Sequence, residues 1–268
     1  YLWVLIKYLS MELNIENKTY VVGGAGAGFG RAISEQLAEN GANVLAISRT
    51  MSKLISLKEK FPDRIEYICG DIMDDKIQDM ALEYAKKENI YGVVFNASGP
   101  PAGNTSGVTM DMWDDAWYNI VRWKINFTYK ILPYMKNQNV GRLLYIESVS
   151  VKEPVANLVL SNSLRPAIVG FAKTLSQEIA HNGITVNILA PGYHSTAAME
   201  RLFAKKAELE NISENEAKEL FEKEIPVGKM GKPEEMAGLA CWILSPLARY
   251  VTGQTITHDG GMVKSVFG

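Results

Sequence analysis

Val21-Val22-Gly23-Gly24-Ala25-Gly26-Ala27-Gly28-Phe29-Gly30 is the stretch that decides the fold, because a short apolar run leads directly into a loop of glycine and alanine. The residues before it, Lys18 to Val22, have the β-branched and aromatic content of a buried strand, and Arg31 to Asn40 carry apolar residues at helical spacing. A glycine-rich turn from strand to helix leaves N–H groups free at the positive end of the helix dipole, and the missing Cβ atoms let a pyrophosphate approach them. The stretch therefore predicts a dinucleotide site.

The overall composition is that of an ordinary globular protein. Of the 268 residues, 47% are hydrophobic and 22% are charged, which is compatible with one large core. The net charge of −2 and the lack of a sustained basic run argue against a nucleic-acid partner. The only cysteines, Cys69 and Cys241, lack the paired spacings of a zinc site or a redox dithiol. We therefore expect two free, mostly buried thiols in a reducing cytoplasm and no metal site.

The N-terminal segment is apolar but short. Tyr1 to Ser10 falls well below the ~20 residues that a membrane helix requires, and it lacks the basic region and small-residue cleavage site of a signal peptide. We therefore expect no membrane association and interpret residues 1–11 as an extension upstream of the domain's natural start, with a packing role in an oligomer as the alternative. Residues 12–268 are expected to form one domain.

Strand-like and helix-like segments alternate along that domain. Apolar strand candidates lie at about 18–23, 42–47, 64–69, 91–96, 141–147, 184–190 and 254–258. Helix-length stretches begin near Gly28, Met51, Asp74, Met110, Leu158 and Pro233. Seven strands with helical crossovers predict an α/β fold, a Rossmann-type doubly wound parallel sheet with helices on both faces. A Lys/Glu-rich stretch around 197–224 is either a lid over the substrate or a plain solvated helical segment.

Further polar or glycine-containing segments follow the other predicted strands, at the edge where open α/β sheets bind ligands. They are Gly70-Asp71-Ile72, Asn96-Ala97-Ser98-Gly99, Ser148 and Pro191-Gly192-Tyr193-His194-Ser195-Thr196. Together with Gly24-x-x-x-Gly28-x-Gly30 and the stretches from Ile225 to Glu235 and from Tyr250 to Gly261, they resemble the short-chain dehydrogenase/reductase family, closest to its 3-oxoacyl-(acyl-carrier-protein) reductase-like members. The resemblance covers about Asn17 to Gly261.

The resemblance implies a set of cofactor-binding residues. They are Gly24, Gly26, Gly28, Phe29 and Gly30 at the pyrophosphate, Asp71 and Ile72 at the adenine, Asn96, Ala97, Ser98 and Gly99 at the ribose, and Pro191, Gly192 and Thr196 at the nicotinamide end. The family usually has Asn-Asn-Ala-Gly where this chain has Asn-Ala-Ser-Gly. For Asn96, the alternative is an Asx turn that ends the strand.

The end of the second strand indicates which dinucleotide is used. An acid there would select NAD by accepting hydrogen bonds from the adenosine 2′-hydroxyl, but the stretch from Ala42 to Leu57 has no Asp or Glu. Arg49 instead offers a charge-assisted fork to a 2′-phosphate, with Ser48 as a further donor. This pattern favours NADP(H). Position 27 in the glycine loop lacks the basic residue common among NADP users, so a plain surface role for Arg49 is the alternative.

The catalytic residues that the family implies are mostly replaced. Family members reduce a carbonyl while a Tyr hydroxyl, four residues before a Lys, donates the proton and a Ser thirteen residues earlier holds the carbonyl oxygen. Ser148 matches that Ser, but the Tyr and Lys positions hold Ser161 and Arg165. No Tyr lies between Tyr145 and Tyr193, and an alignment without gaps places Ile120 where the family has a catalytic Asn.

The remaining groups suggest how this site would work. We expect Ser148 and Ser161 to bind the carbonyl oxygen and Arg165 to bind the cofactor ribose, although a guanidinium does not shuttle protons at neutral pH. A water or His194 would then complete the proton path. For both Tyr193 and His194 a non-catalytic role is favoured.

The sequence thus predicts a cytoplasmic NADP(H)-dependent reductase of a small-molecule or acyl-thioester ketone with a non-standard proton donor. A catalytically weak or inactive NADP(H)-binding homologue, acting as a sensor or as a partner subunit, is the alternative. The family also implies a homo-oligomer, a tetramer or dimer, formed through the long helices near 110–137 and 158–181. Apolar residues of the second helix, such as Leu160 and Ile168, would serve that interface or would pack on the chain's own sheet.

Overall fold

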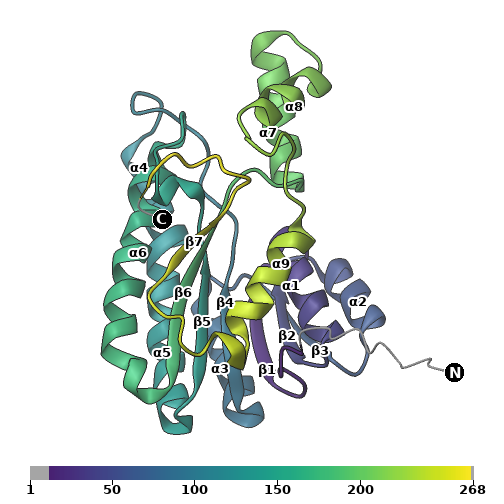
Figure 1. Ribbon diagram of the computed structural model, residues 1–268, viewed down its shortest axis with the longest axis vertical. Coiled ribbons are helices and arrows are strands. Elements are labelled where there is room, and N and C mark those ends of the chain that lie inside the picture. Colours follow the sequence, from purple (N-terminus) through teal and green to yellow (C-terminus); the bar gives the residue numbers. More distant parts are fainter. Residues whose placement is uncertain (1–11, 267–268) are drawn as a thin grey trace, which may run out of the picture.

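Seven parallel strands form a single sheet in the order β3-β2-β1-β4-β5-β6-β7 (Figure 1). The computed structural model describes residues 12–266, so the extension expected over residues 1–11 lies outside the described residues. The strands are β1 (Thr19–Gly23), β2 (Asn43–Ser48), β3 (Ile65–Cys69), β4 (Ile90–Phe95), β5 (Gly141–Ile146), β6 (Ile184–Pro191) and β7 (Thr255–His258). The predicted fold class is confirmed.

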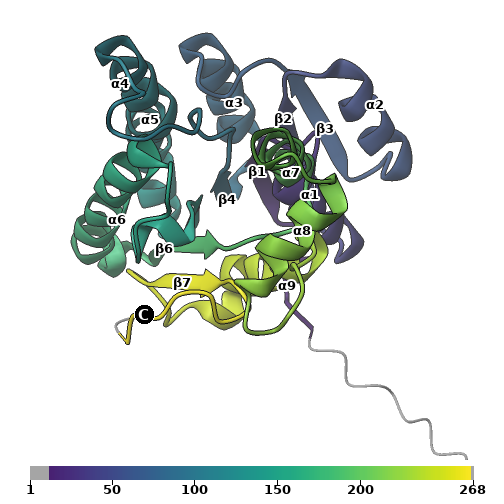
Figure 2. The same ribbon diagram turned by 90° about the horizontal axis from the view of Figure 1, so that it is seen from above.

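Helices cover both faces of this sheet (Figure 2). The main helices are α1 (Gly28–Glu39), α2 (Met51–Lys60), α3 (Asp75–Glu88), α4 (Met110–Trp117), α5 (Trp123–Gln138), α6 (Val159–Ile179) and α9 (Pro233–Leu244). Buried residues of α1, α2 and α9 form one apolar cluster with the sheet, and those of α3, α5 and α6 form the other. The interior strands read as continuous apolar runs because both of their faces are buried, as in β4 and β5.

The strand order changes direction at β1. Its backbone pairs with β2 on one side and with β4 on the other, so the chain winds outward in opposite directions from this point. A crevice opens at the carboxyl ends of the strands beside such a reversal, and this is where open α/β sheets bind their ligands. The glycine loop between β1 and α1 lies at that edge.

Two helices project beyond the body of the domain (Figure 1). They are α7 (Ala197–Glu210) and α8 (Glu214–Lys223), which occupy the Lys/Glu-rich stretch. Their apolar side chains, among them Phe203 and Ala217, pack in a separate small cluster with Ile225 and Met230. The stretch is therefore more than a solvated helix, and its role as a lid stays a prediction.

A π-helical turn, Tyr118–Arg122, joins α4 to α5. Such a turn holds an extra residue, so it rotates the helical face that follows. Ile120, at the position expected for the family's Asn, is 1% exposed and lies in the apolar core. Leu160 and Ile168 of α6 are buried in the same core, which supports the packing alternative over an interface role. Within residues 12–266, no helix is long and apolar enough to cross a membrane.

Candidate active site

The glycine loop presents an open helix N-terminus. Gly24 and Gly28 have φ values of +63° and +53°, a backbone conformation that favours glycine. Ala27 precedes α1 and provides no side-chain hydrogen bond to its first turn, so backbone N–H groups there remain available to an anion. The segment after β6 lies next to the loop, because a Cβ atom added to Gly28 would be 3.7 Å from Thr196 Cγ2. The loop is thus shaped to accept a pyrophosphate.

Arg49 follows β2 and contacts residues that follow β3 and β4. Its guanidinium donates to the Ser98 hydroxyl at 3.3 Å after β4 and lies 3.6 Å from the Asp71 carboxylate after β3. The side chain is 65% exposed. Ser48 lies directly under the glycine loop, because a Cβ on Gly26 would come within 2.4 Å of its Oγ. A cation and a hydroxyl therefore lie together at the expected adenosine end, which fits a 2′-phosphate.

Asn96 connects two strand ends. Its Nδ2 donates to the Gly23 carbonyl at 3.1 Å, across 73 positions of sequence. A Cβ on Gly24 would lie 2.6 Å from the same Nδ2. The side chain therefore holds the start of the glycine loop against the end of β4, rather than capping a local Asx turn. Ile72 is buried close by, with its Cγ2 3.5 Å from a Cβ on Gly23.

Three serines and an arginine meet beyond the end of β5. Ser148 Oγ accepts the Ser150 N–H at 3.2 Å, which leaves the Ser148 hydroxyl proton free to donate. Ser161 Oγ accepts from Arg165 Nε at 2.9 Å and shares a further hydrogen bond with Ser150 Oγ at 3.0 Å. Since Ser161 is only 5% exposed, its hydroxyl faces the protein, while the Arg165 side chain keeps an exposed fraction of 12%. The structure thus brings together all three predicted catalytic residues.

A buried ion cluster lies behind Arg165. Glu147, whose side chain is 0% exposed, receives Arg165 Nη1 on Oε2 at 2.8 Å and Lys124 Nζ on Oε1. Lys124 is 4% exposed, and burial lowers the pKa of its ammonium. Sequence reasoning missed both residues. One sequence feature could have indicated Lys124, because this lysine falls on the same apolar face of α5 as Phe127 and Ile131.

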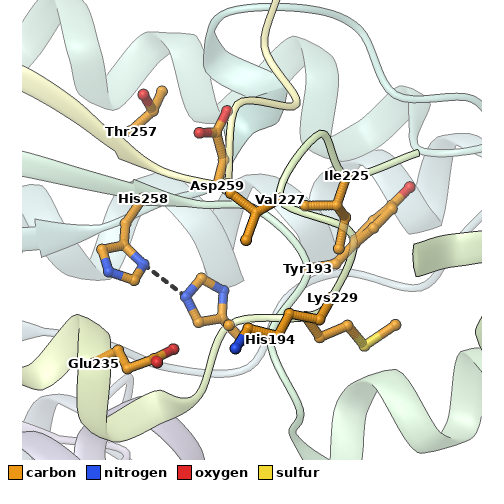
Figure 3. Close-up of a pocket in the computed structure, with 12 residues that line it drawn as sticks. Tyr193, His194, Ile225, Val227, Lys229, Glu235, Thr257, His258 and Asp259 are labelled. Carbon is orange, nitrogen blue, oxygen red and sulfur yellow. Dashed lines mark hydrogen bonds between the residues drawn. The ribbon is translucent and has the colours of Figure 1, made fainter. Parts of the chain in front are cut away.

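The two residues after Gly192 point to different partners. Tyr193 donates its hydroxyl to Glu224 at 3.1 Å, and burial raises its pKa. His194 Nδ1 lies 3.0 Å from the Gly192 carbonyl, so Nδ1 is the protonated nitrogen, and Nε2 accepts from His258 Nδ1 at 2.8 Å (Figure 3). Both ring nitrogens of His194 are therefore engaged within the protein. This geometry does not favour His194 as a proton donor.

The His194–His258 pair borders a cavity of about 360 Å³ (Figure 3). The ends of β6 and β7, the loop before α9 and the first turn of α9 contribute its lining, including Tyr193, Lys229 and Glu235. On its other side, the His194 ring packs edge-on against Phe29 of α1, with the ring centroids 5.0 Å apart. The histidine pair thus lies between the cofactor loop and the base of α7 and α8.

Known proteins resemble this chain along almost its whole length. It is 30% identical to the NADPH-dependent reductase BacG of Bacillus subtilis strain 168, over 94% of this chain and 100% of that protein. It is 28% identical to the 3-oxoacyl-(acyl-carrier-protein) reductase FabG of Vibrio harveyi, with 93% and 99% covered. The crystal structure of YwfH, an NADPH-dependent reductase involved in bacilysin biosynthesis, matches with a TM-score of 0.88 and 26% identity, over 94% of this chain and all of that one.

A family model described as enoyl-(acyl carrier protein) reductase matches residues 24–263. The match begins in the glycine loop, directly after β1, and runs through β2 to β7 and the paired helices α7 and α8. With the strand order and the strand-end residues described above, it shows that the chain belongs to the short-chain dehydrogenase/reductase family.

Proposed function

We propose that this protein is an NADPH-dependent reductase of a ketone, such as a 3-oxoacyl thioester. The observation that carries the proposal is a chain of contacts at the carboxyl edge of the sheet, in which Ser150 links the hydroxyl of Ser148 to Ser161 and Ser161 in turn holds the cation of Arg165. A carbonyl oxygen gains negative charge during reduction, and a hydrogen-bond donor and a fixed cation both stabilise that charge. Relatives named as NADPH-dependent and 3-oxoacyl reductases support the same class.

The residues fit the cofactor. The N–H groups at the start of α1 would hold the pyrophosphate, and Arg49 with Ser48 would hold the 2′-phosphate. Thr196, whose Cγ2 lies 3.7 Å from a Cβ position on Gly28, would face the nicotinamide half. When bound, NADPH supplies the hydride that adds to the carbonyl carbon.

The protein's own groups then act on the carbonyl oxygen. Ser148 donates a hydrogen bond to it, and Arg165 stabilises the developing alkoxide. Ser161 is occupied by Arg165 and Ser150, and both nitrogens of His194 have partners. The proton therefore comes from a water in the cleft in this proposal.

A cofactor-binding protein without hydride chemistry is the second candidate. It is favoured by the buried hydrogen bond between Ser161 and Arg165, which occupies the positions where the family implies a proton-donating Tyr and its Lys. Such a protein would act as a sensor or as an inactive partner of a related subunit. It would bind NADPH tightly and show no turnover.

One experiment separates these candidates. NADPH oxidation is measured over a panel of ketones, 3-oxoacyl thioesters and aldehydes, together with NADPH binding by fluorescence. For the reductase, Ser148→Ala should lower kcat by about 100-fold, the usual effect of losing one oxyanion donor. Ser163→Ala removes an exposed serine of α6 and serves as the control. Unchanged turnover in Ser148→Ala would contradict the role assigned to Ser148, and binding without any turnover would establish the second candidate.

We also propose a cytoplasmic homo-oligomer, a dimer or tetramer. Large apolar side chains are exposed along α4 and α5, where an oligomer interface is expected: Met110, Trp117, Tyr118 and Tyr129. Light scattering coupled to size-exclusion chromatography measures the mass directly. A monomer at micromolar concentration would contradict this proposal.

A further inference from the structure

We propose that Glu147 and Lys124 are positioning residues that orient Arg165 and preserve its positive charge toward the cleft. This inference rests on the proposed reductase function and names the groups that sustain it. Neither residue touches the cleft, since the side chains of Glu147 and Lys124 are 0% and 4% exposed. Their effect is transmitted through the Arg165 guanidinium, which both Glu147 and Ser161 contact.

The orientation of Arg165 follows from two contacts on one planar group. Ser161 holds Nε at 2.9 Å, and Glu147 holds Nη1 at 2.8 Å. Because the guanidinium is rigid and planar, these contacts fix the direction of Nη2. That nitrogen faces the loop after β4, where a Cβ on Gly99 would lie 3.0 Å away, and it makes no hydrogen bond within residues 12–266. Nη2 is thus the donor left for an anionic oxygen.

The charge of Arg165 depends on Lys124. A carboxylate next to a guanidinium would by itself cancel most of the positive potential that the cleft experiences. Burial lowers the pKa of Lys124 and the Glu147 carboxylate raises it. With its ammonium charged, Lys124 supplies a second cation on the opposite carboxylate oxygen, so Glu147, Lys124 and Arg165 together carry a net charge of +1. In this low-dielectric interior a unit charge acts over several ångströms with little screening.

Stability alone does not account for Lys124. Its side chain lies on the same face of α5 as the core residues Phe127 and Ile131. Apolar side chains in place of a whole buried ion cluster are often as stable, so the fold does not require Glu147, Lys124 and Arg165 as a set; with Glu147 present, removal of Lys124 alone leaves the buried carboxylate with one cation fewer. The π-helical turn just before α5 directs this face toward Glu147. The contribution of Lys124 to the cluster is therefore its charge on the Glu147 carboxylate.

Lys124→Met tests the charge. It keeps both contacts of Arg165 but reduces the cluster to neutrality, so kcat should fall roughly 10- to 100-fold with KM nearly unchanged. Tm should fall as well, because Glu147 loses a buried partner, and kcat is therefore measured well below the unfolding transition. Lys130→Met is the matched control, because Lys130 lies on the same helix and pairs with Asp75 and Asp79 at the surface. A kcat within twofold of wild type in Lys124→Met would overturn the charge role.

Glu147→Gln tests the orientation without requiring turnover. The Arg165 Nη1–H signal in the ¹⁵N NMR spectrum reports on the contact with Glu147 and is assigned by its absence in Arg165→Lys. It should exchange with water at least tenfold faster in Glu147→Gln and remain slow in Lys124→Met. If Glu147→Gln does not fold, Glu147→Asp withdraws the carboxylate by one methylene and is measured instead. Unchanged exchange would overturn the orientation role. If exchange is faster in Glu147→Gln but the wild-type protein shows no turnover, the positioning role stands and the proposed function is rejected.

Discussion

Arg165 Nε donates to the Oγ of Ser161, one helical turn earlier on α6, at 2.9 Å. Where the family resemblance implies a phenol and an amine that exchange protons, this chain has a hydroxyl and a guanidinium that are hydrogen-bonded to each other. Neither group is suited to deliver a proton at neutral pH. The relationship predicts that Ser161 supports Arg165 instead of acting as an acid.

Ser161→Ala should therefore have a modest effect. The variant removes one neutral acceptor of Arg165 but leaves the contact with Glu147, so kcat should fall less than about tenfold, corresponding to ~1 kcal/mol. A general acid would contribute 10²–10⁴-fold, so a loss in that range would show that Ser161 donates the proton. Steady-state kinetics of Ser161→Ala and Ser148→Ala, measured together, make the comparison.

Arg49→Gln should alter cofactor choice. Removing the guanidinium deletes the charge available to a 2′-phosphate, so the Kd for NADPH should rise about 10- to 100-fold while the Kd for NADH changes little. Fluorescence titration with both dinucleotides measures the two constants. Lys58→Gln, which breaks a surface ion pair with Glu66, is the control. Equal losses for NADPH and NADH would show that Arg49 is a plain surface arginine.

His194 should make the protein less stable in mild acid. Burial lowers the pKa of its imidazole below the unfolded value of about 6.5. Between those two pKa values the unfolded chain binds a proton that the folded chain does not, so the free energy of unfolding decreases as pH falls through this window. The contribution is at most about 1.4 kcal/mol per pH unit.

Urea unfolding at pH 7.5, 6.5 and 5.5 measures this dependence. His194→Asn keeps an amide donor near the Gly192 carbonyl but does not titrate, so its stability should fall less over the same range. His181→Asn changes an exposed histidine and is the control. Parallel pH dependence in wild type and His194→Asn would rule out the assigned role of His194.

The two cysteines should differ sharply in reactivity. Burial raises the pKa of the Cys241 thiol to about 12, so it has almost no thiolate at pH 8. Cys69 is exposed, so the expectation of two mostly buried thiols was wrong for this residue. A disulfide reagent should label one thiol per native chain and two per unfolded chain. Cys69→Ser should leave the native protein unlabelled. Rapid labelling of native Cys69→Ser would show that Cys241 becomes accessible.

Strand and helix positions were predictable because the physics that sets them is local. Strands buried on both faces, such as β4 and β5, appear as uninterrupted apolar runs. The glycine loop, with Gly28 in a left-handed conformation, separates the apolar run of β1 from the helical spacing of apolar residues in α1. Ser148, Ser161 and Arg165 were predicted as one group and lie together. Their roles in catalysis stay predictions.

The groups that sequence reasoning missed depend on contacts between distant segments. Counting along the helix without gaps placed Ile120 at the expected Asn position, and the π-helical turn shifts the face that follows it, so that Lys124 reaches Glu147. His194 and His258 are 64 positions apart, and their pairing removes His194 as a donor. A linear pattern contains no information about such a local change in helical register.

The sequence by itself determined the parallel sheet and the glycine loop at its edge, since both follow from residue type and spacing along the chain. That Ser161 stands where the family resemblance implies a phenol acid stays a prediction. Only the tertiary structure decided which groups face the cleft and which are engaged within the protein. Burial of the Glu147 carboxylate requires compensating positive charge. Lys124 of α5 and Arg165 of α6 provide it, and these two residues are 41 positions apart in the sequence. Their charge balance exists only once the chain has folded.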